Sequence, residues 1–141
     1  MKRVLFICLH NSARSQMAEA ILNHMYPQHY IAYSAGVEPA KEVNPYVVCA
    51  LREIGLDISQ NRPKSLEVFA GWEFDYVVTV CEEGETRCPF FPGGKHYLHK
   101  SFPDPSILTG SDEEIMQKVR NIRDEIRQWI LNTFSPNGDG D

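Results

Sequence analysis

Short continuous apolar runs alternate along the chain with stretches in which apolar residues recur every three or four positions. Runs of the first kind are typical of strands buried on both faces of a sheet, and the second spacing is typical of helices. We expect strands over residues 3–7, 30–35, 75–80 and 96–99. We expect helices over residues 17–26, 45–54 and 65–70, and a long final helix with an apolar stripe ending at Ile130. Strands that alternate with helices predict an α/β fold with a parallel sheet and right-handed crossovers.

Polar residues mark the starts of three of these helices. Ser15 is a suitable N-cap for the first helix, because its hydroxyl can accept a hydrogen bond from a helical amide. Asn44 followed by a proline fits the start of the second helix. Ser111 with Glu114 three residues later forms a capping box before the final helix.

The 141 residues predict one domain over residues 1–134, followed by a flexible tail over 135–141. No apolar run approaches the roughly 18 residues of a membrane span, and the start lacks an apolar signal region. We therefore expect a cytoplasmic protein that does not bind membranes. The net charge of −5 argues against a nucleic-acid-binding protein, whose surface is basic. It leaves room for a small anionic ligand, which a few local groups can bind.

The loop after the first apolar run carries the strongest chemical signal in the chain. An oxyanion in such a loop would meet backbone N–H groups, the positive end of a helix and the Arg14 guanidinium. The same field favours the thiolate of Cys8, which is the nucleophilic form. The alternative is a buried core cysteine and a surface arginine, but the strand before the loop and the helix after it favour the anion site. The predicted loop consists of Cys8, Leu9, His10, Asn11, Ser12, Ala13, Arg14 and Ser15.

Two further cysteines follow the third apolar run. Cys8 and Cys81 both end predicted parallel strands, so they should share the edge of the sheet where ligands bind. Six residues separate Cys81 from Cys88, and a pliable segment of this length could join the two sulfurs or bring Cys81 to Cys8. One alternative is a zinc site that also uses His96 and His99, although its spacing is longer than usual. Another is a pair of unrelated structural cysteines.

Two other residues have a plain structural interpretation on local sequence. Cys49 falls within the second helix, where we expect it to be a small buried apolar residue. Asp104 lies between two prolines, which fits an ordinary surface turn. If the Asp104 turn folds over Cys8, however, its carboxyl group could protonate a leaving oxygen.

With these residues in view, the chain resembles the thioredoxin-coupled arsenate reductases, which share the fold of the low-molecular-weight protein tyrosine phosphatases. The resemblance spans about residues 2–131 and implies a three-layer α/β/α fold with a four-stranded parallel sheet. Its sharpest parts are Cys-x-x-Asn-Ser-x-Arg-Ser-Gln-Met-Ala-Glu at 8–19, Ser34-Ala35-Gly36, Val77-Val78-Thr79-Val80-Cys81 and Asp104-Pro105. The pair of Cys81 and Cys88 is what separates reductases from phosphatases.

The resemblance implies a relay of cysteines that reduces arsenate to arsenite. Cys8 would attack arsenate held by the loop amides and Arg14, while Asp104 helps water to leave. Cys81 would then attack Cys8, expel arsenite and form a disulfide with Cys8. Cys88 would move the disulfide to Cys81–Cys88, which thioredoxin reopens. Weak phosphatase activity could persist, because the loop distinguishes phosphate from arsenate poorly.

The same resemblance implies supporting roles and partners. Ser15 would stabilise the Cys8 thiolate, and Asn11 would hold the loop shape through its side chain. No tightly bound cofactor is needed, phosphate or sulfate should compete with arsenate, and we expect a monomer. Position 13 is Ala13, where several relatives carry a further cysteine, so that cysteine is not essential here.

The resemblance also bears on metal binding. Some relatives bind potassium through the counterparts of Asn11, Glu19 and Ser34 and a later acidic residue. Here that later region contains Lys64, whose charge we expect to replace the ion. We therefore expect no metal requirement.

Two other functions are compatible with the sequence. A phosphatase of the same fold would need Cys8, Arg14 and Asp104 but neither of the two later cysteines. Such phosphatases usually carry a tyrosine after the Asp-Pro pair, and here the residue is Ser106, which favours the reductase. A redox-sensing or anion-binding module without turnover is the third option, and the intact nucleophile, arginine and candidate acid argue against it.

Overall fold

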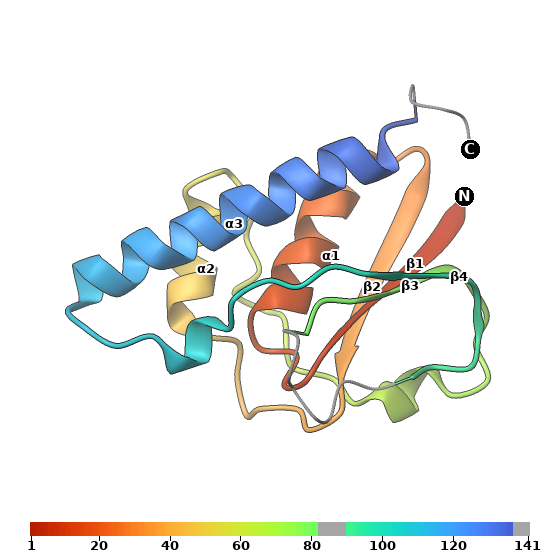
Figure 1. Ribbon diagram of the computed structural model, residues 1–141, viewed down its shortest axis with the longest axis horizontal. Coiled ribbons are helices and arrows are strands. Elements are labelled where there is room, and N and C mark those ends of the chain that lie inside the picture. Colours follow the sequence, from red (N-terminus) through yellow and green to blue (C-terminus); the bar gives the residue numbers. More distant parts are fainter. Residues whose placement is uncertain (82–89, 137–141) are drawn as a thin grey trace.

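A computed structural model describes residues 1–81 and 90–136, and within them the predicted parallel sheet is present (Figure 1). The strands lie in the order β2-β1-β3-β4, so β1 is central and β4 is an edge strand. The strands are β1 (Lys2–Cys8), β2 (Tyr30–Gly36), β3 (Phe74–Thr79) and β4 (Gly94–His99). The helices are α1 (Arg14–Met25), α2 (Pro45–Arg52) and α3 (Asp112–Phe134), with 3-10 turns η1 (Leu66–Phe69) and η2 (Pro105–Ile107).

The register of the sheet brings the ends of β1 and β3 to the same edge. Ile7 in β1 lies opposite Thr79 in β3, and the Val80 amide donates to the Ile7 carbonyl at 2.9 Å. Neighbouring strands are about 4.8 Å apart. Cys8 and Cys81 therefore leave adjacent strands at one edge, as the sequence predicts.

The two faces of the sheet are covered differently. Val4, Phe6 and Val78 point into a core formed with α1 and α3, and α2 packs against α3 on this side. Leu5 and Val77 point to the opposite face, which η1 and a cluster of aromatic residues cover. Figure 1 shows the three α-helices on one side of the sheet and η1 on the other. The predicted α/β fold is confirmed, with a short 3-10 turn and its flanking loops as the third layer.

Two of the three predicted helix starts are confirmed, and one is wrong. Asn44 caps α2 by accepting from the Tyr46 amide at 2.9 Å, and Ser111 forms the predicted capping box of α3. Ser15 does not cap α1, because the helix already begins at Arg14 and its N-cap residue is Ala13. The Ser15 hydroxyl is used elsewhere, within the loop that precedes the helix.

The prediction that Cys49 is buried is also wrong, since its side chain is exposed. Helix α2 has eight residues and buries one stripe, made of Val47, Ala50 and Leu51. Cys49 falls outside that stripe, although its neighbours in sequence are apolar.

Residues 137–141 lie outside the described residues, so the flexible tail stays a prediction.

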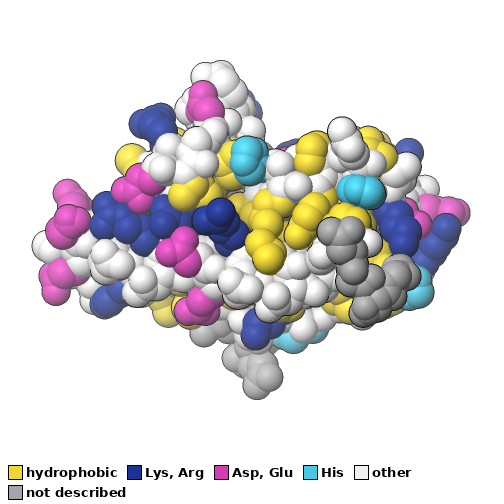
Figure 2. Space-filling model, turned by 90° about the horizontal axis from the view of Figure 1, so that it is seen from above, with side chains coloured by type: hydrophobic (Ala, Val, Ile, Leu, Met, Phe, Trp, Pro, Cys, Tyr) yellow, Lys and Arg dark blue, Asp and Glu magenta, His cyan; other side chains and the backbone are white. Residues whose placement is uncertain are grey.

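Ion pairs tie α3 to the end of α2. Arg120 and Arg123 both bind the Glu53 carboxylate, at 2.9 and 2.8 Å, and Arg123 also donates to the Ala50 carbonyl at 2.8 Å. Figure 2 shows basic and acidic side chains mixed along this side of the molecule. No helix within the described residues is long and apolar enough to cross a membrane.

Candidate active site

The backbone carbonyl groups of the loop between β1 and α1 accept hydrogen bonds from the surrounding protein. The five carbonyls from Leu9 to Ala13 each accept a hydrogen bond, and the donors are Glu38 N, Ala40 N, Gln16 Nε2, Asn44 N and Met17 N at 2.8–3.2 Å. Within the described residues, the amides of Leu9, His10, Ser12 and Ala13 donate to no protein acceptor. This arrangement leaves a row of N–H donors for an oxyanion, beside the N-terminus of α1.

Asn11 determines the shape of this loop. Its φ of 51° lies in the left-handed region, and its side chain is fully buried. The side-chain amide donates to Ser15 Oγ at 2.7 Å, while its oxygen accepts from the Lys64 amide at 2.8 Å and from Gln16 Nε2 at 3.0 Å. Asparagine tolerates the left-handed region better than most residues. The hydrogen bonds join the loop to α1 and to the chain at residue 64.

The end of β2 supports the loop from the other side. Gly36 lies so close that a Cβ atom there would meet Asn11 N and Leu9 O at 2.8 Å. Gly36 also donates its amide to the Lys64 carbonyl at 2.8 Å. A glycine is therefore required at this position by a close backbone approach.

Cys8 lies at the base of the loop with two polar neighbours on its sulfur. The residue is 2% exposed, Asn11 N donates to Sγ at 3.3 Å, and Ser15 Oγ is 2.9 Å from Sγ. Because Ser15 Oγ already accepts from Asn11 Nδ2, its hydroxyl proton can be donated to the sulfur. The sulfur therefore lies beside two polar groups and the N-terminus of α1, at the position where the sequence predicts the nucleophile.

Arg14 connects the loop to two other segments. Its guanidinium donates to the Val80 carbonyl at 3.5 Å and to the Phe102 carbonyl at 3.2 Å, and Nη2 is 3.6 Å from Asp104 Oδ2. Arg14 is 2% exposed, so these contacts lie in a largely desolvated site. Val80 directly precedes Cys81, so one arginine contacts the anion loop, the end of β3 and the segment that holds the candidate acid.

Asp104 is held in one orientation by Ser106. The Ser106 amide and hydroxyl both donate to Asp104 Oδ1, at 2.9 and 2.8 Å. The other oxygen, Oδ2, therefore faces Arg14. The structure thus brings Asp104 to the loop, where local sequence alone favoured an ordinary surface turn.

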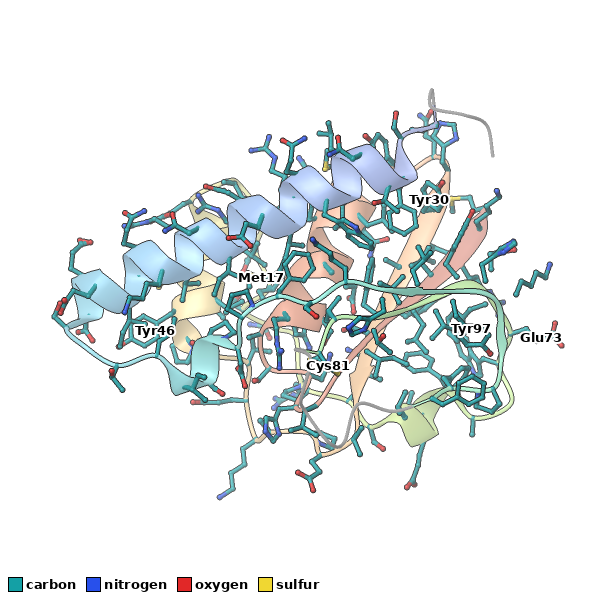
Figure 3. All side chains as sticks on the ribbon, in the orientation of Figure 1. Met17, Tyr30, Tyr46, Glu73, Cys81 and Tyr97 are labelled. Carbon is teal, nitrogen blue, oxygen red and sulfur yellow. The ribbon has the colours of Figure 1, made fainter. Side chains whose placement is uncertain are left out.

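Cys81 is fully buried at the edge of the sheet where β1 ends (Figure 3). Cys88 lies outside the described residues.

The two histidines of the alternative zinc site lie on β4. His99 contacts Thr79 Oγ1 at 2.7 Å, while the His96 ring packs against Tyr76. Three residues apart on β4, the two histidines point to opposite faces, which argues against their joining one zinc site. Within the described residues, no cluster of histidine, cysteine, aspartate and glutamate fits a metal ion.

Glu19, Ser34 and Lys64 form a polar cluster behind the loop. The Ser34 hydroxyl donates to Glu19 Oε1 at 2.5 Å, and the Lys64 ammonium is 3.8 Å from the same oxygen. Burial raises the pKa of Glu19, and the Ser34 hydrogen bond and the Lys64 charge oppose this shift. Lys64 thus brings a positive charge to the place where the sequence suggested a cation.

Comparison with known proteins identifies the family. Residues 3–135 match the family described as low molecular weight phosphotyrosine protein phosphatase. The chain belongs to this family. An arsenate reductase of Halalkalibacterium halodurans is 39% identical over 137 residues, which are 97% of each chain. The resemblance to arsenate reductases is therefore confirmed.

Two solved structures share the fold of this family member. One is an arsenate reductase in a phosphate-binding state, with a TM-score of 0.77 and 28% identity over 94% of this chain and 95% of that chain. The other is a thioredoxin-dependent arsenate reductase of Corynebacterium glutamicum, with a TM-score of 0.65 and 36% identity. That match covers 94% of this chain and 61% of that chain.

Gln16, Gly36 and Ser106 shape the site, although the sequence predicted no role for them. Gln16 is fully buried and bonds Asn11 twice, and it also joins Arg62 and Asn61 to the loop. The only signal for Gln16 and Gly36 was their place within the family motifs. Ser106 was noted only as a replacement for tyrosine, and its contact with Asp104 needs the folded turn.

The Gly36 contact predicts the effect of adding one methyl group. Gly36→Ala should force the loop backbone to move and weaken phosphate binding by at least about tenfold, which corresponds to about 1.4 kcal/mol. Isothermal titration with phosphate measures this loss. Gly55→Ala is the control, because a Cβ added at Gly55 has no atom within 4 Å, and the substitution is strained only by the φ of +84° at that position. That variant should lose stability and keep its phosphate affinity; equal affinity in both variants would contradict the prediction.

The raised pKa of Glu19 predicts a pH-dependent loss of stability. Since the folded state binds this proton more tightly than the unfolded state, the free energy of unfolding falls as pH rises above the ordinary value of 4.5. Glu19→Gln should remove that part of the decline, and Lys64→Gln should extend it to higher pH. Urea unfolding from about pH 4 to 8 measures all three proteins. Parallel profiles for the wild type and Glu19→Gln would show the prediction to be wrong.

Proposed function

We propose that this protein reduces arsenate to arsenite through a cysteine relay that thioredoxin regenerates. The observation that carries the proposal is the neighbourhood of two cysteines at one sheet edge, one of them in an anion-binding loop. Reduction of arsenate takes two electrons, and two thiols supply them when they become a disulfide. The name of the Halalkalibacterium halodurans relative supports arsenate as the substrate, and that of the Corynebacterium glutamicum protein supports thioredoxin as the reductant.

The first step joins arsenate to the enzyme. The loop amides and Arg14 hold the oxyanion, and the Cys8 thiolate attacks arsenic to form an S–As bond. One arsenate oxygen leaves as water after it takes up protons, one of which comes from Asp104 Oδ2. Ser106 keeps that oxygen directed towards Arg14, at the edge of the anion site.

The second step is the reduction itself. The Cys81 thiolate attacks the Cys8 sulfur, and the electron pair of the S–As bond passes to arsenic, which leaves as arsenite. Cys8 and Cys81 are then joined by a disulfide. Because Cys8 is 2% exposed and Cys81 is fully buried, a protein reductant cannot reach this disulfide where it forms.

The third step transfers the disulfide to a cysteine pair that a protein reductant can reach. The Cys88 thiolate attacks Cys81, releases Cys8 as a thiolate and leaves a Cys81–Cys88 disulfide. A thioredoxin dithiol then reduces that disulfide by two successive exchanges and becomes oxidised. A third cysteine is thus required by the burial of the first two. We also propose a monomer that works in the cytoplasm, without a bound cofactor and with phosphate or sulfate as competing anions.

Phosphatase activity on small phosphate esters is the second candidate. The family description favours it, and Cys8, Arg14 and Asp104 are the groups that it needs. The Ser106 hydroxyl is engaged with Asp104, and no aromatic side chain follows Pro105 to hold an aryl ester. We therefore expect this activity to be weak.

Substitution of the later cysteines separates the two activities. Cys81→Ser or Cys88→Ser should abolish multiple-turnover arsenate reduction with thioredoxin, thioredoxin reductase and NADPH, while hydrolysis of an aryl phosphate persists. Cys8→Ser should lose both activities, because it lacks the nucleophile. Cys49→Ser is the matched control, since this exposed cysteine has no place in the relay, and it should keep the wild-type rate. If Cys81→Ser lost both activities equally, the relay would be ruled out.

The Lys64 position predicts independence from potassium. Arsenate reduction should proceed at equal rates in sodium and potassium buffers of the same ionic strength, because the ammonium group already lies 3.8 Å from Glu19. Initial rates of arsenite formation measure this directly. Clear stimulation by potassium would contradict a replacement of the ion by Lys64.

A further inference from the structure

An exposed group of aromatic side chains lies between η1 and β4. Phe90 is 72% exposed, and its ring stacks on that of Tyr97 with centroids 5.1 Å apart. Tyr97 is 46% exposed and Trp72 is 36% exposed. Figure 3 shows Tyr97 on the β4 side of the molecule, away from α1. We call Trp72, Phe90 and Tyr97 the aromatic surface; exposed apolar surfaces of this kind commonly mark interaction sites.

Phe90 forms a ridge between two grooves. One groove has a volume of about 480 Å³ and is lined by Leu66, Trp72 and Pro92 beside Phe90. The other has a volume of about 400 Å³ and extends from Phe90 to His99 at the end of β4. A ridge with a hollow on each side can insert into a partner and receive apolar side chains from it.

The segment that carries this ridge is held in place by its neighbours. The Tyr97 hydroxyl donates to the Phe91 carbonyl at 2.8 Å and accepts from the Gly94 amide at 3.0 Å. Phe91 is buried and packs against Phe74 with ring centroids 5.7 Å apart. The aromatic surface is therefore formed before any partner arrives, which lowers the entropic cost of binding.

The covalent chain places a limit on what can dock nearby. Phe90 follows Cys88 by two residues, so at most about 7 Å of extended chain separates their Cα atoms. A protein that reduces the relay disulfide must bring a thiolate into bonding distance of Cys81 or Cys88. The surface around that thiolate must then lie against the residues that flank the relay cysteines. Among the described residues close to Cys88 in sequence, Phe90 is an apolar residue that is 72% exposed.

We propose that the aromatic surface docks the dithiol protein of the thioredoxin class that reduces the relay disulfide, through apolar residues around its nucleophilic cysteine. The inference rests on the proposed function and adds the place of contact. Aromatic anchors with neighbouring pockets are typical of the few residues that dominate binding energy. Redox encounters bury little surface, so one ridge can supply much of their affinity.

Direct binding tests the surface without arsenate chemistry. The probe is a thioredoxin with both active-site cysteines replaced by serine, titrated into the full-length protein and followed by NMR. Phe90→Ala should raise the dissociation constant about tenfold, a change of about 1.4 kcal/mol. Leu131→Ala is the matched control, because Leu131 is an exposed apolar residue on α3 and should leave the affinity unchanged. Equal affinity of Phe90→Ala and wild type would overturn the proposal.

Kinetics then separate docking from the relay itself. With thioredoxin, Phe90→Ala should raise KM for the reductant about tenfold. With dithiothreitol, and in a single turnover without reductant, its arsenite release should match the wild type. An equal loss with dithiothreitol, or a dimer that dissociates in Phe90→Ala, would assign the surface to another role and overturn the proposal. If the wild-type protein released no arsenite, but its binding to thioredoxin still depended on Phe90, the proposed function would be rejected and the docking surface would be retained.

Discussion

The site depends on one buried asparagine. Asn11 adopts a left-handed backbone conformation, and its side chain bonds Ser15, Gln16 and the Lys64 amide from the interior of the loop. Buried polar groups are costly unless they are paired, so these hydrogen bonds stabilise one loop shape over the alternatives. In that shape the loop carbonyls accept hydrogen bonds from the surrounding protein, and loop amides are left to donate to an anion. The same network reaches the Cys8 sulfur through Ser15, so the loop amides and the sulfur share one support.

The order of strands supplies the second cysteine. Because β1 and β3 are parallel neighbours at the centre of the sheet, the residues that follow them meet at one edge. Cys8 and Cys81 are close for this reason, although 72 residues separate them in sequence. A central position also buries both, which keeps their sulfurs away from water and from adventitious thiols. In the proposed relay, this burial means that the disulfide must be transferred to Cys88 before a protein can reduce it.

Most of the fold could be predicted from patterns that act locally. Continuous apolar runs identified the strands, and the capping residues Asn44 and Ser111 identified two helix starts, because these signals depend on near neighbours. The failures share a cause. Ser15 was assigned to a helix cap, yet its hydroxyl is engaged by Cys8 and Asn11 across the loop. Cys49 was assigned to the core, yet tertiary packing selects a different stripe of α2. Contacts across a folded loop and packing between elements decide such cases, and one sequence shows them only through a family motif.

An acidic protein can bind a doubly charged oxyanion because the relevant field is local. Charges on the surface act over about 8 Å at physiological ionic strength, whereas loop amides and Arg14 act at hydrogen-bond distance in a buried site. The carboxylate closest to this site from behind is Glu19, which is half-buried there. Burial raises its pKa and so disfavours its negative charge, while Lys64 offers a compensating positive charge 3.8 Å away. Whether Glu19 is protonated or paired with Lys64, the net charge behind the loop stays near zero or positive. The loop therefore presents its donors to an anion without an opposing charge in the wall behind it.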